Sequence, residues 1–115
     1  MYCAGLGLRV LGGFKDHQGF DGVMLGDPGA QYHFEFTRCR PHPVAPLSTE
    51  EDLLVLYVPD RAEWKLGCAR MLTAGFRSVP SSNPYWDIDG RTFADADGYR
   101  TVLQNAAWRN QEATP

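Results

Sequence analysis

A proline-rich segment over residues 40–51 divides this chain into two strand-forming halves. The segment holds three prolines within its first seven residues, and proline is excluded from helix interiors and central strands because it lacks an N–H and fixes φ. Each half must therefore form its own sheet, and at 115 residues the two together have the size of one domain. We predict one domain over residues 1–105, with modules at 1–39 and 52–105, a connection at 40–51 and a polar tail at 106–115.

The second half has the pattern of a strand, a helix and three further strands. Residues 53–58 are a continuous apolar run, which is typical of a strand covered on both faces. Asp60 and Glu63 form a capping box that predicts the start of a helix, and Gly75 is placed to end it. Further strands are predicted at residues 76–79, 90–95 and 99–104, with a loop at 80–89.

The predicted helix carries an apolar stripe that we expect to face the sheet. Its members recur at close to helical spacing and are Leu66, Ala69, Leu72 and, just past the helix, Phe76.

The first half repeats the pattern of the second with only the end of a helix. Residues 1–7 resemble the last turn of a helix that stops at Gly5 or Gly7. Strands predicted at 8–14, 20–26 and 31–39 are joined by short turns into an antiparallel meander. The predicted fold class is therefore α+β with an internal repeat, and the two uncovered sheet faces should meet around a cavity.

Composition limits the partners and the compartment that we expect. The net charge of −3 and the pI near 5.5 argue against nucleic acid and against an anionic membrane surface as partners. No apolar run approaches the roughly 20 residues of a membrane span, and the first residues lack the features of a signal peptide. Cys3, Cys39 and Cys68 are an odd number without paired spacing, which favours free thiols and a cytoplasmic protein.

Four segments in order resemble the vicinal oxygen chelate superfamily, which includes glyoxalase I, bleomycin-resistance proteins and extradiol dioxygenases. The matching segments are YCAGLGLRVLG at residues 2–12, HFEFT at 33–37, LTAGF at 72–76 and DADGYR at 95–100. The resemblance implies paired βαβββ modules, of which the first is N-terminally truncated and lacks its first strand and most of its first helix. We expect either a coding frame that begins further upstream or a naturally shortened member.

The resemblance also implies where metal ligands would lie. Family enzymes hold a divalent metal such as Zn, Ni, Mn or Fe through His and Glu side chains on the first and last strands of each module. Glu35 matches one such position, whereas residues 52–55 contain no His and Val102 occupies the last-strand position. The internal repeat aligns His33 with Val102 and Glu35 with Gln104. We therefore expect no full metal site, and if a metal binds, Glu35 and His33 would hold it.

These observations leave several functions open. The favoured interpretation is a protein that binds a small molecule between its modules, without a cofactor, through His33, Glu35, Tyr85, Trp86 and Gln104. The alternative is a metal-dependent lyase or dioxygenase that uses Glu35 with ligands from the absent N-terminal strand, and a third is a fold that has lost its chemistry. No catalytic residue is identified, so enzymatic activity stays open.

Two structural expectations accompany this interpretation. A carboxylate that faces a cavity needs a partner, so we expect His33 or Arg100 to pair with Glu35. Without a strand beside it, the strand at 31–39 becomes an exposed edge that carries Tyr32, Phe34 and Phe36, and such edges promote pairing between chains. We therefore expect a homodimer.

Overall fold

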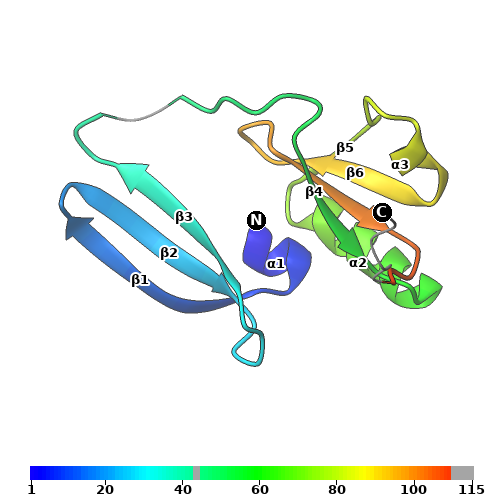
Figure 1. Ribbon diagram of the computed structural model, residues 1–115, viewed down its shortest axis with the longest axis horizontal. Helices are drawn as coiled ribbons and strands as arrows, with labels where there is room; N and C mark the ends of the chain where they lie inside the picture. Colours follow the sequence, from blue (N-terminus) through cyan, green and yellow to red (C-terminus); the bar gives the residue numbers. More distant parts are fainter. Residues whose placement is uncertain (43–44, 110–115) are drawn as a thin grey trace, which may run out of the picture.

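The computed structural model describes residues 1–42 and 45–109 and contains two separate β-sheets (Figure 1). The first sheet is an antiparallel meander in the order β1-β2-β3, as the sequence predicts. Its strands are β1 (Arg9–His17), β2 (Phe20–Gly26) and β3 (His33–Cys39). β1 is longer than predicted because it continues to a tight turn, in which Asp16, Gln18 and Gly19 adopt positive φ.

The second sheet has four strands in the order β4-β7-β6-β5. Its elements are β4 (Leu53–Tyr57), α2 (Arg61–Thr73), β5 (Arg77–Val79), β6 (Gly90–Ala94) and β7 (Arg100–Gln104). β4 runs parallel to β7, and the other neighbours are antiparallel. This arrangement confirms the predicted strand, helix and three strands, with α2 as the crossover that a parallel pair requires.

The start of α2 was predicted correctly, but the face that it buries was not. Asp60 Oδ1 accepts a hydrogen bond from the Glu63 N–H at 2.8 Å, as expected of a cap. Leu66 and Leu72, however, are 62% and 45% exposed, and Ala69 is exposed as well. Of the predicted stripe, Phe76, just past the helix, is buried as expected.

The buried face of α2 consists instead of Trp64, Gly67, Cys68, Met71 and Ala74. The helix lies close to the sheet at Gly67, where a Cβ would be 3.4 Å from the Leu103 Cδ1 methyl group of β7. In addition, the Trp64 indole N–H donates a hydrogen bond to the Leu103 carbonyl at 2.8 Å. Small residues and this hydrogen bond therefore determine how the helix is rotated.

The segment 80–89 is not a simple loop, contrary to the prediction. It contains a short helix, α3 (Tyr85–Ile88). Asn83 Oδ1 accepts the Tyr85 N–H at 3.0 Å, and the Asp87 carboxylate accepts the Ser81 N–H. Local side-chain acceptors thus stabilise one helical turn that has no hydrophobic periodicity to predict it.

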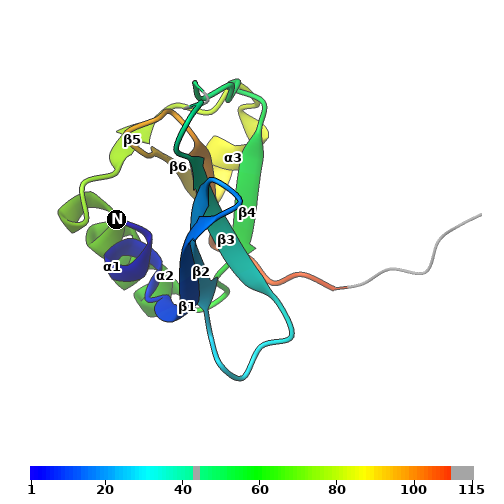
Figure 2. The ribbon, with the colours of Figure 1, turned by 90° about the vertical axis from the view of Figure 1, so that its left-hand side faces the viewer.

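The two halves are joined through α1 (Tyr2–Leu6), which packs against α2 on the same side of both sheets (Figure 2). α1 ends at Gly7 in the left-handed conformation, so of the two predicted stops, Gly5 and Gly7, the structure uses Gly7. Gly5 lies at the helix contact, where a Cβ would be 2.8 Å from Met71 Sδ and 2.9 Å from the Phe76 ring. Only glycine therefore fits this contact without movement of its neighbours.

The core lies in the second half, between α2 and the sheet. Its buried members are Cys68, Met71, Phe76, Phe93 and Leu103. The radius of gyration is 15.9 Å, above the roughly 13 Å of a compact domain of this length, so the molecule is more extended than a compact domain. In the described part of the chain, no helix is long and apolar enough to cross a membrane.

Candidate functional site

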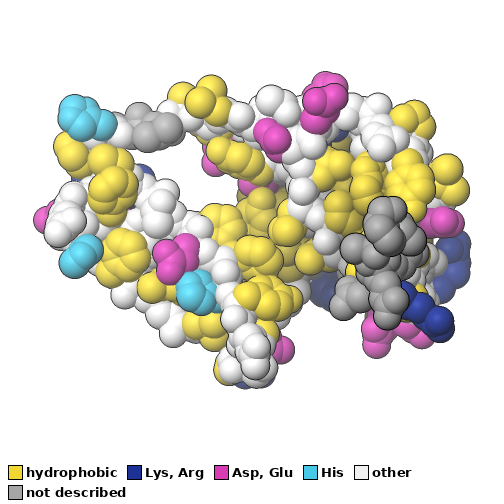
Figure 3. Space-filling model, in the orientation of Figure 1, with side chains coloured by type: hydrophobic (Ala, Val, Ile, Leu, Met, Phe, Trp, Pro, Cys, Tyr) yellow, Lys and Arg dark blue, Asp and Glu magenta, His cyan; other side chains and the backbone are white. Residues whose placement is uncertain are grey.

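A cavity of about 860 Å³ lies where the two halves of the molecule face each other. It is bordered by β3, by the beginnings of β4 and β7, and by α1. Much of its wall is apolar, with contributions from Leu6, Phe34, Phe36, Leu53 and Leu54. Figure 3 shows the opening between the halves with hydrophobic side chains along its wall. The predicted cavity between the modules therefore exists.

The cavity follows the free edges of two strands. Among the residues that the structure describes, β3 pairs only with β2 and β4 only with β7, so each is the edge strand of its sheet. Side chains from both faces of β3 line the cavity, among them His33 and Glu35 from one face and Phe34 and Phe36 from the other. A strand can present both faces to one space only when its edge points there. This confirms the prediction that β3 is an edge strand.

His33 and Glu35 form a polar pair on the cavity wall. His33 Nε2 lies 3.0 Å from Glu35 Oε1, and the two side chains are 43% and 48% exposed. A carboxylate can only accept, so the His33 ring donates to it. Of the two partners expected for Glu35, the structure selects His33. Arg100 instead donates to the Pro80 carbonyl at 3.0 Å and lies 3.8 Å from a carboxylate oxygen of Glu50.

Tyr2 and Asp95 form a second polar pair, which connects the two modules. The Tyr2 hydroxyl donates to Asp95 Oδ2 at 2.6 Å, and Asp95 Oδ1 accepts the N–H groups of Asp97 and Tyr99 at 2.9 Å. Burial, followed by the hydrogen bond to Asp95 and its charge, raises the pKa of the Tyr2 phenol well above its ordinary value. Tyr2 is therefore a neutral donor at the cavity.

Tyr2 and Asp95 belong to segments that carry the family resemblance, but their place in the site was not predicted. The available signal was that these residues lie in the first and the last of the four segments that match the superfamily, at residues 2–12 and 95–100. Nothing in the pattern indicated that these two segments meet.

The remaining predicted ligand-binding residues lie elsewhere. Tyr85, Trp86 and Gln104 do not line the cavity. Tyr85 and Trp86 begin α3 and contact each other edge to face, with ring centroids 4.9 Å apart. Gln104 is buried against Gly90, and its Oε1 has no hydrogen-bond partner in the described structure. The structure thus brings together His33 and Glu35 but separates them from the other three.

The residues present do not fit a resident divalent metal. Within residues 1–42 and 45–109, no group of three or more His, Cys, Asp or Glu side chains gathers as a metal site. Glu35 and His33 bind each other, and Val102 and Gln104 at the aligned positions of β7 are buried. Two donors are fewer than the three or four that protein metal sites use.

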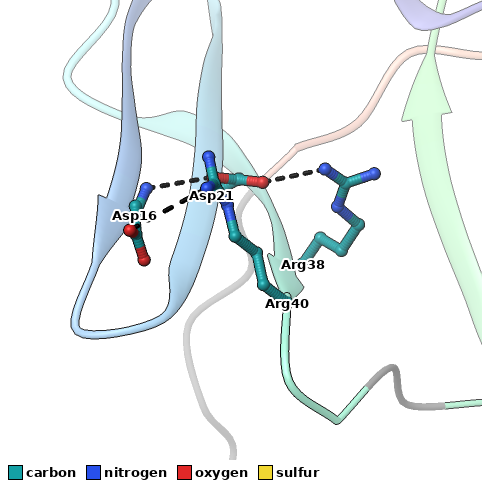
Figure 4. A network of polar contacts seen from close by, with 4 residues as sticks. All are labelled: Asp16, Asp21, Arg38 and Arg40. Carbon is teal, nitrogen blue, oxygen red and sulfur yellow. Dashed lines mark hydrogen bonds and ion pairs between the residues drawn. The ribbon is translucent and has the colours of Figure 1, made fainter.

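A separate charged cluster lies at the end of the first sheet where the β1–β2 turn meets the end of β3 (Figure 4). Asp21 accepts hydrogen bonds from Arg40 Nε at 2.8 Å, Arg38 Nη2 at 2.9 Å and the Asp16 N–H at 3.0 Å. The Arg40 guanidinium, then the Asp16 N–H and Arg38, hold the pKa of the Asp21 carboxyl well below its usual range. The cluster ties the β1–β2 turn to the end of β3.

Comparison with known proteins identifies the family. Residues 1–37 match the model of the YycE-like N-terminal domain, and residues 51–105 match that of the YycE-like C-terminal domain. The uncharacterized protein YycE of Bacillus subtilis is 42% identical over 105 residues, which is 91% of this chain and 76% of that protein.

A solved structure of a YycE protein of unknown function from Bacillus subtilis, named as a candidate glyoxalase or fosfomycin resistance protein, has a TM-score of 0.88. It is 40% identical and aligns over 96% of this chain and 81% of that one.

More distant structures share the fold alone. The trypanothione-dependent glyoxalase I of Leishmania major has a TM-score of 0.66 at 20% identity, over 91% of this chain and 73% of its own. TnmS3, an antibiotic binding protein from a Streptomyces species, has a TM-score of 0.58 at 22% identity, over 92% and 81%. The chain matches both domain models of the YycE-like family, and its structure has the paired modules with a cavity between them. The chain therefore belongs to the YycE-like family of the glyoxalase and bleomycin-resistance superfamily.

Proposed function

We propose that this protein binds a small organic molecule in the cavity between its two modules, without a full metal site. The observation that carries the proposal is the cavity itself: about 860 Å³, with apolar walls and a few converging polar groups. This size and lining are typical of small-molecule sites. The polar groups that would orient a ligand are the His33–Glu35 pair and the Tyr2–Asp95 pair.

The comparisons support a binding role of this kind. The similar Bacillus subtilis structure is named as a candidate glyoxalase or fosfomycin resistance protein, and TnmS3, which shares the fold, is named as an antibiotic binding protein. The alternative, a metal-dependent lyase or dioxygenase, needs donors beyond Glu35 and His33. The donor set in the described residues therefore favours binding over metal-assisted catalysis.

A ligand titration tests the proposal. Fosfomycin, which the name of the Bacillus subtilis structure suggests, and bleomycin, which the resemblance to bleomycin-resistance proteins suggests, are added to the purified chain. The thermal midpoint and ligand-observed NMR signals are recorded. A ligand at about 100 times its Kd stabilises the folded state by about 2.7 kcal/mol, so binding raises the midpoint by several degrees.

Two arginine substitutions locate the site. Leu53→Arg places a long charged side chain in the cavity and should abolish the shift, whereas Leu72→Arg on the exposed side of α2 should leave it unchanged. Binding that survives Leu53→Arg would place the ligand elsewhere.

We also propose that the chain forms a homodimer. Val10, Tyr32 and Phe36 are exposed on or beside the first sheet, and β3 has a free edge. Sedimentation at micromolar concentration should give twice the chain mass. Phe34→Lys should dissociate or precipitate the protein, whereas Arg109→Glu near the end of the chain should do neither. A stable monomer would contradict the proposal.

We also propose that the protein is cytoplasmic. All three cysteines, Cys3, Cys39 and Cys68, are free thiols, as expected of a protein in a reducing environment.

A further inference from the structure

We propose that the cavity selects a positively charged amphipathic molecule, an organic ammonium ion with an apolar body, and disfavours anions such as phosphonates. This inference rests on the proposed function, because it assigns a ligand class to the same cavity. It follows from which charged groups line the cavity and from which of them are already paired.

Carboxylates outnumber basic groups on the cavity wall. Glu35, Asp52, Asp95 and Asp97 line it, against Arg100 as the single arginine or lysine among the described lining residues. Met1 also lines it, and a positive charge on its amino group still leaves the balance negative. A space with apolar walls and one sign of charge concentrates ligands of the opposite sign.

Both basic side chains on the described cavity wall already have partners, which weakens their attraction for an anion. Arg100 is 14% exposed, donates to the Pro80 carbonyl and lies beside Glu50. The imidazole of His33 donates to Glu35. An anionic ligand would compete with Glu50 for Arg100 or with Glu35 for His33. It would also lie near several carboxylates, which costs Coulomb energy.

The acidic groups, in contrast, retain capacity to accept hydrogen bonds. An ionised carboxylate has about four lone-pair positions, and Glu35 uses one of its oxygens for His33. The Asp97 carboxylate has no hydrogen-bond partner within residues 1–42 and 45–109, although its backbone N–H is bound to Asp95. An ammonium group has three N–H donors, which matches these acceptors.

The aromatic wall favours the same ligand class. Tyr2 and Phe36 are in contact, with ring centroids 4.9 Å apart, and both line the cavity. A cation near an aromatic face is attracted by the ring quadrupole, and the apolar residues around it can cover an organic body. Charge, free acceptors and aromatic rings therefore point to one chemistry.

The experiment compares two probes that share one apolar body. 1-Naphthylmethylamine carries an ammonium group and 1-naphthoate a carboxylate, and each is titrated into the full chain at pH 7 and low salt by calorimetry and ligand-observed NMR. We expect the ammonium probe to bind about tenfold tighter or more, the scale of one or two charge interactions near a protein surface. Added salt should reduce this difference.

Two matched substitutions locate the effect. Glu35→Gln removes a charge on the cavity wall and should weaken only the ammonium probe, whereas Glu63→Gln makes the same change on α2, which does not line the cavity, and should leave both affinities unchanged. Circular dichroism checks that both variants are folded, and Asp97→Asn repeats the test at a second carboxylate.

The outcomes separate this inference from the proposed function. If 1-naphthoate binds as tightly as the ammonium probe or tighter, the charge preference is wrong while small-molecule binding in the cavity stands. If neither probe, bleomycin nor fosfomycin binds at millimolar concentration, the proposed function fails and this inference fails with it.

Discussion

The two sheets of this molecule have related strand patterns but very different surroundings. Val102 and Gln104 on β7 are 0% and 3% exposed, whereas His33 and Glu35, the aligned residues on β3, are about half exposed. β7 has a neighbouring strand on both edges, and β3 has one on a single edge. Equivalent positions thus serve as core in one module and as cavity wall in the other.

The cause of the difference is the helix that each module contributes. α2 has 13 residues and covers one face of the second sheet, while α3 lies against the opposite face (Figure 2). α1 has five residues and is used largely to contact α2. The second module therefore supplies most of the stability, and the first supplies an open sheet edge that a ligand can contact.

The largest loss of stability should come from truncating a large side chain in the core of the second module. Phe93 is fully buried, and Phe93→Ala should lower the free energy of unfolding by about 3–5 kcal/mol because of lost burial and a residual cavity. Phe20→Ala makes the same change on the exposed first sheet and should cost under about 1 kcal/mol. Urea denaturation measures both, and equal losses would show that the two sheets do not differ in this way.

A smaller loss is expected at the contact between the modules. Gly5→Val places a side chain against Met71 and Phe76 and should cost about 1–3 kcal/mol through overpacking. Gly12→Val in β1 is the matched control, since a Cβ there meets no atom within 4 Å. We expect the control to be neutral or slightly stabilising in thermal melts, and a loss in both variants would argue against a specific contact at Gly5.

Removing the hydrogen bond between the modules should have a moderate, pH-dependent effect. Tyr2→Phe deletes the donor to Asp95 and should cost about 1–2 kcal/mol. Because the pKa of the Tyr2 phenol is raised in the folded state, its contribution is complete below about pH 10 and is lost as the pH rises further. The difference in urea midpoint between wild type and Tyr2→Phe should therefore shrink at high pH.

Tyr32→Phe, at an exposed tyrosine, serves as the control and should show no such pH dependence. If Tyr2→Phe loses no stability, the ring packing that phenylalanine retains, and not the hydroxyl, joins the modules.

The smallest effect should come from the charged cluster on the first sheet. Asp21→Asn weakens the contacts to Arg38 and Arg40, and because these hold the pKa of Asp21 low, their contribution is present at neutral pH and lost as the pH falls through the acid range. The variant should melt slightly below wild type at pH 7 and close to it at acid pH. Asp27→Asn, whose amide oxygen can still accept the Gly29 N–H, should match wild type throughout.

Patterns that are local in the sequence predicted most of the fold. The apolar run at 53–58, the Asp60 cap and the stops at Gly7 and Gly75 were each decided by a few neighbouring residues, and the structure confirms them. The rotation of α2 was predicted wrongly because the prediction used the spacing of large apolar side chains. The buried face instead contains the small residues Gly67 and Cys68, which let the helix lie close to the sheet.

The candidate site was predicted only where its residues are neighbours along one strand. His33 and Glu35 are two residues apart and share a strand face, so their pairing could be predicted from alternation. The pair of Tyr2 and Asp95 joins residues 93 positions apart, and no local pattern indicates such a contact.

The sequence by itself determined the strands, the first two helices, their order and the division into two modules, because caps, turns and alternation act over a few residues; α3 was not predicted. The tertiary structure alone decided which sheet is covered, since coverage depends on where α1 and α2 meet and on the small residues that allow their contact. It also decided that the free edges of β3 and β4 border one cavity. Those edges come from segments that are adjacent in space only after both modules have folded and α1 has docked.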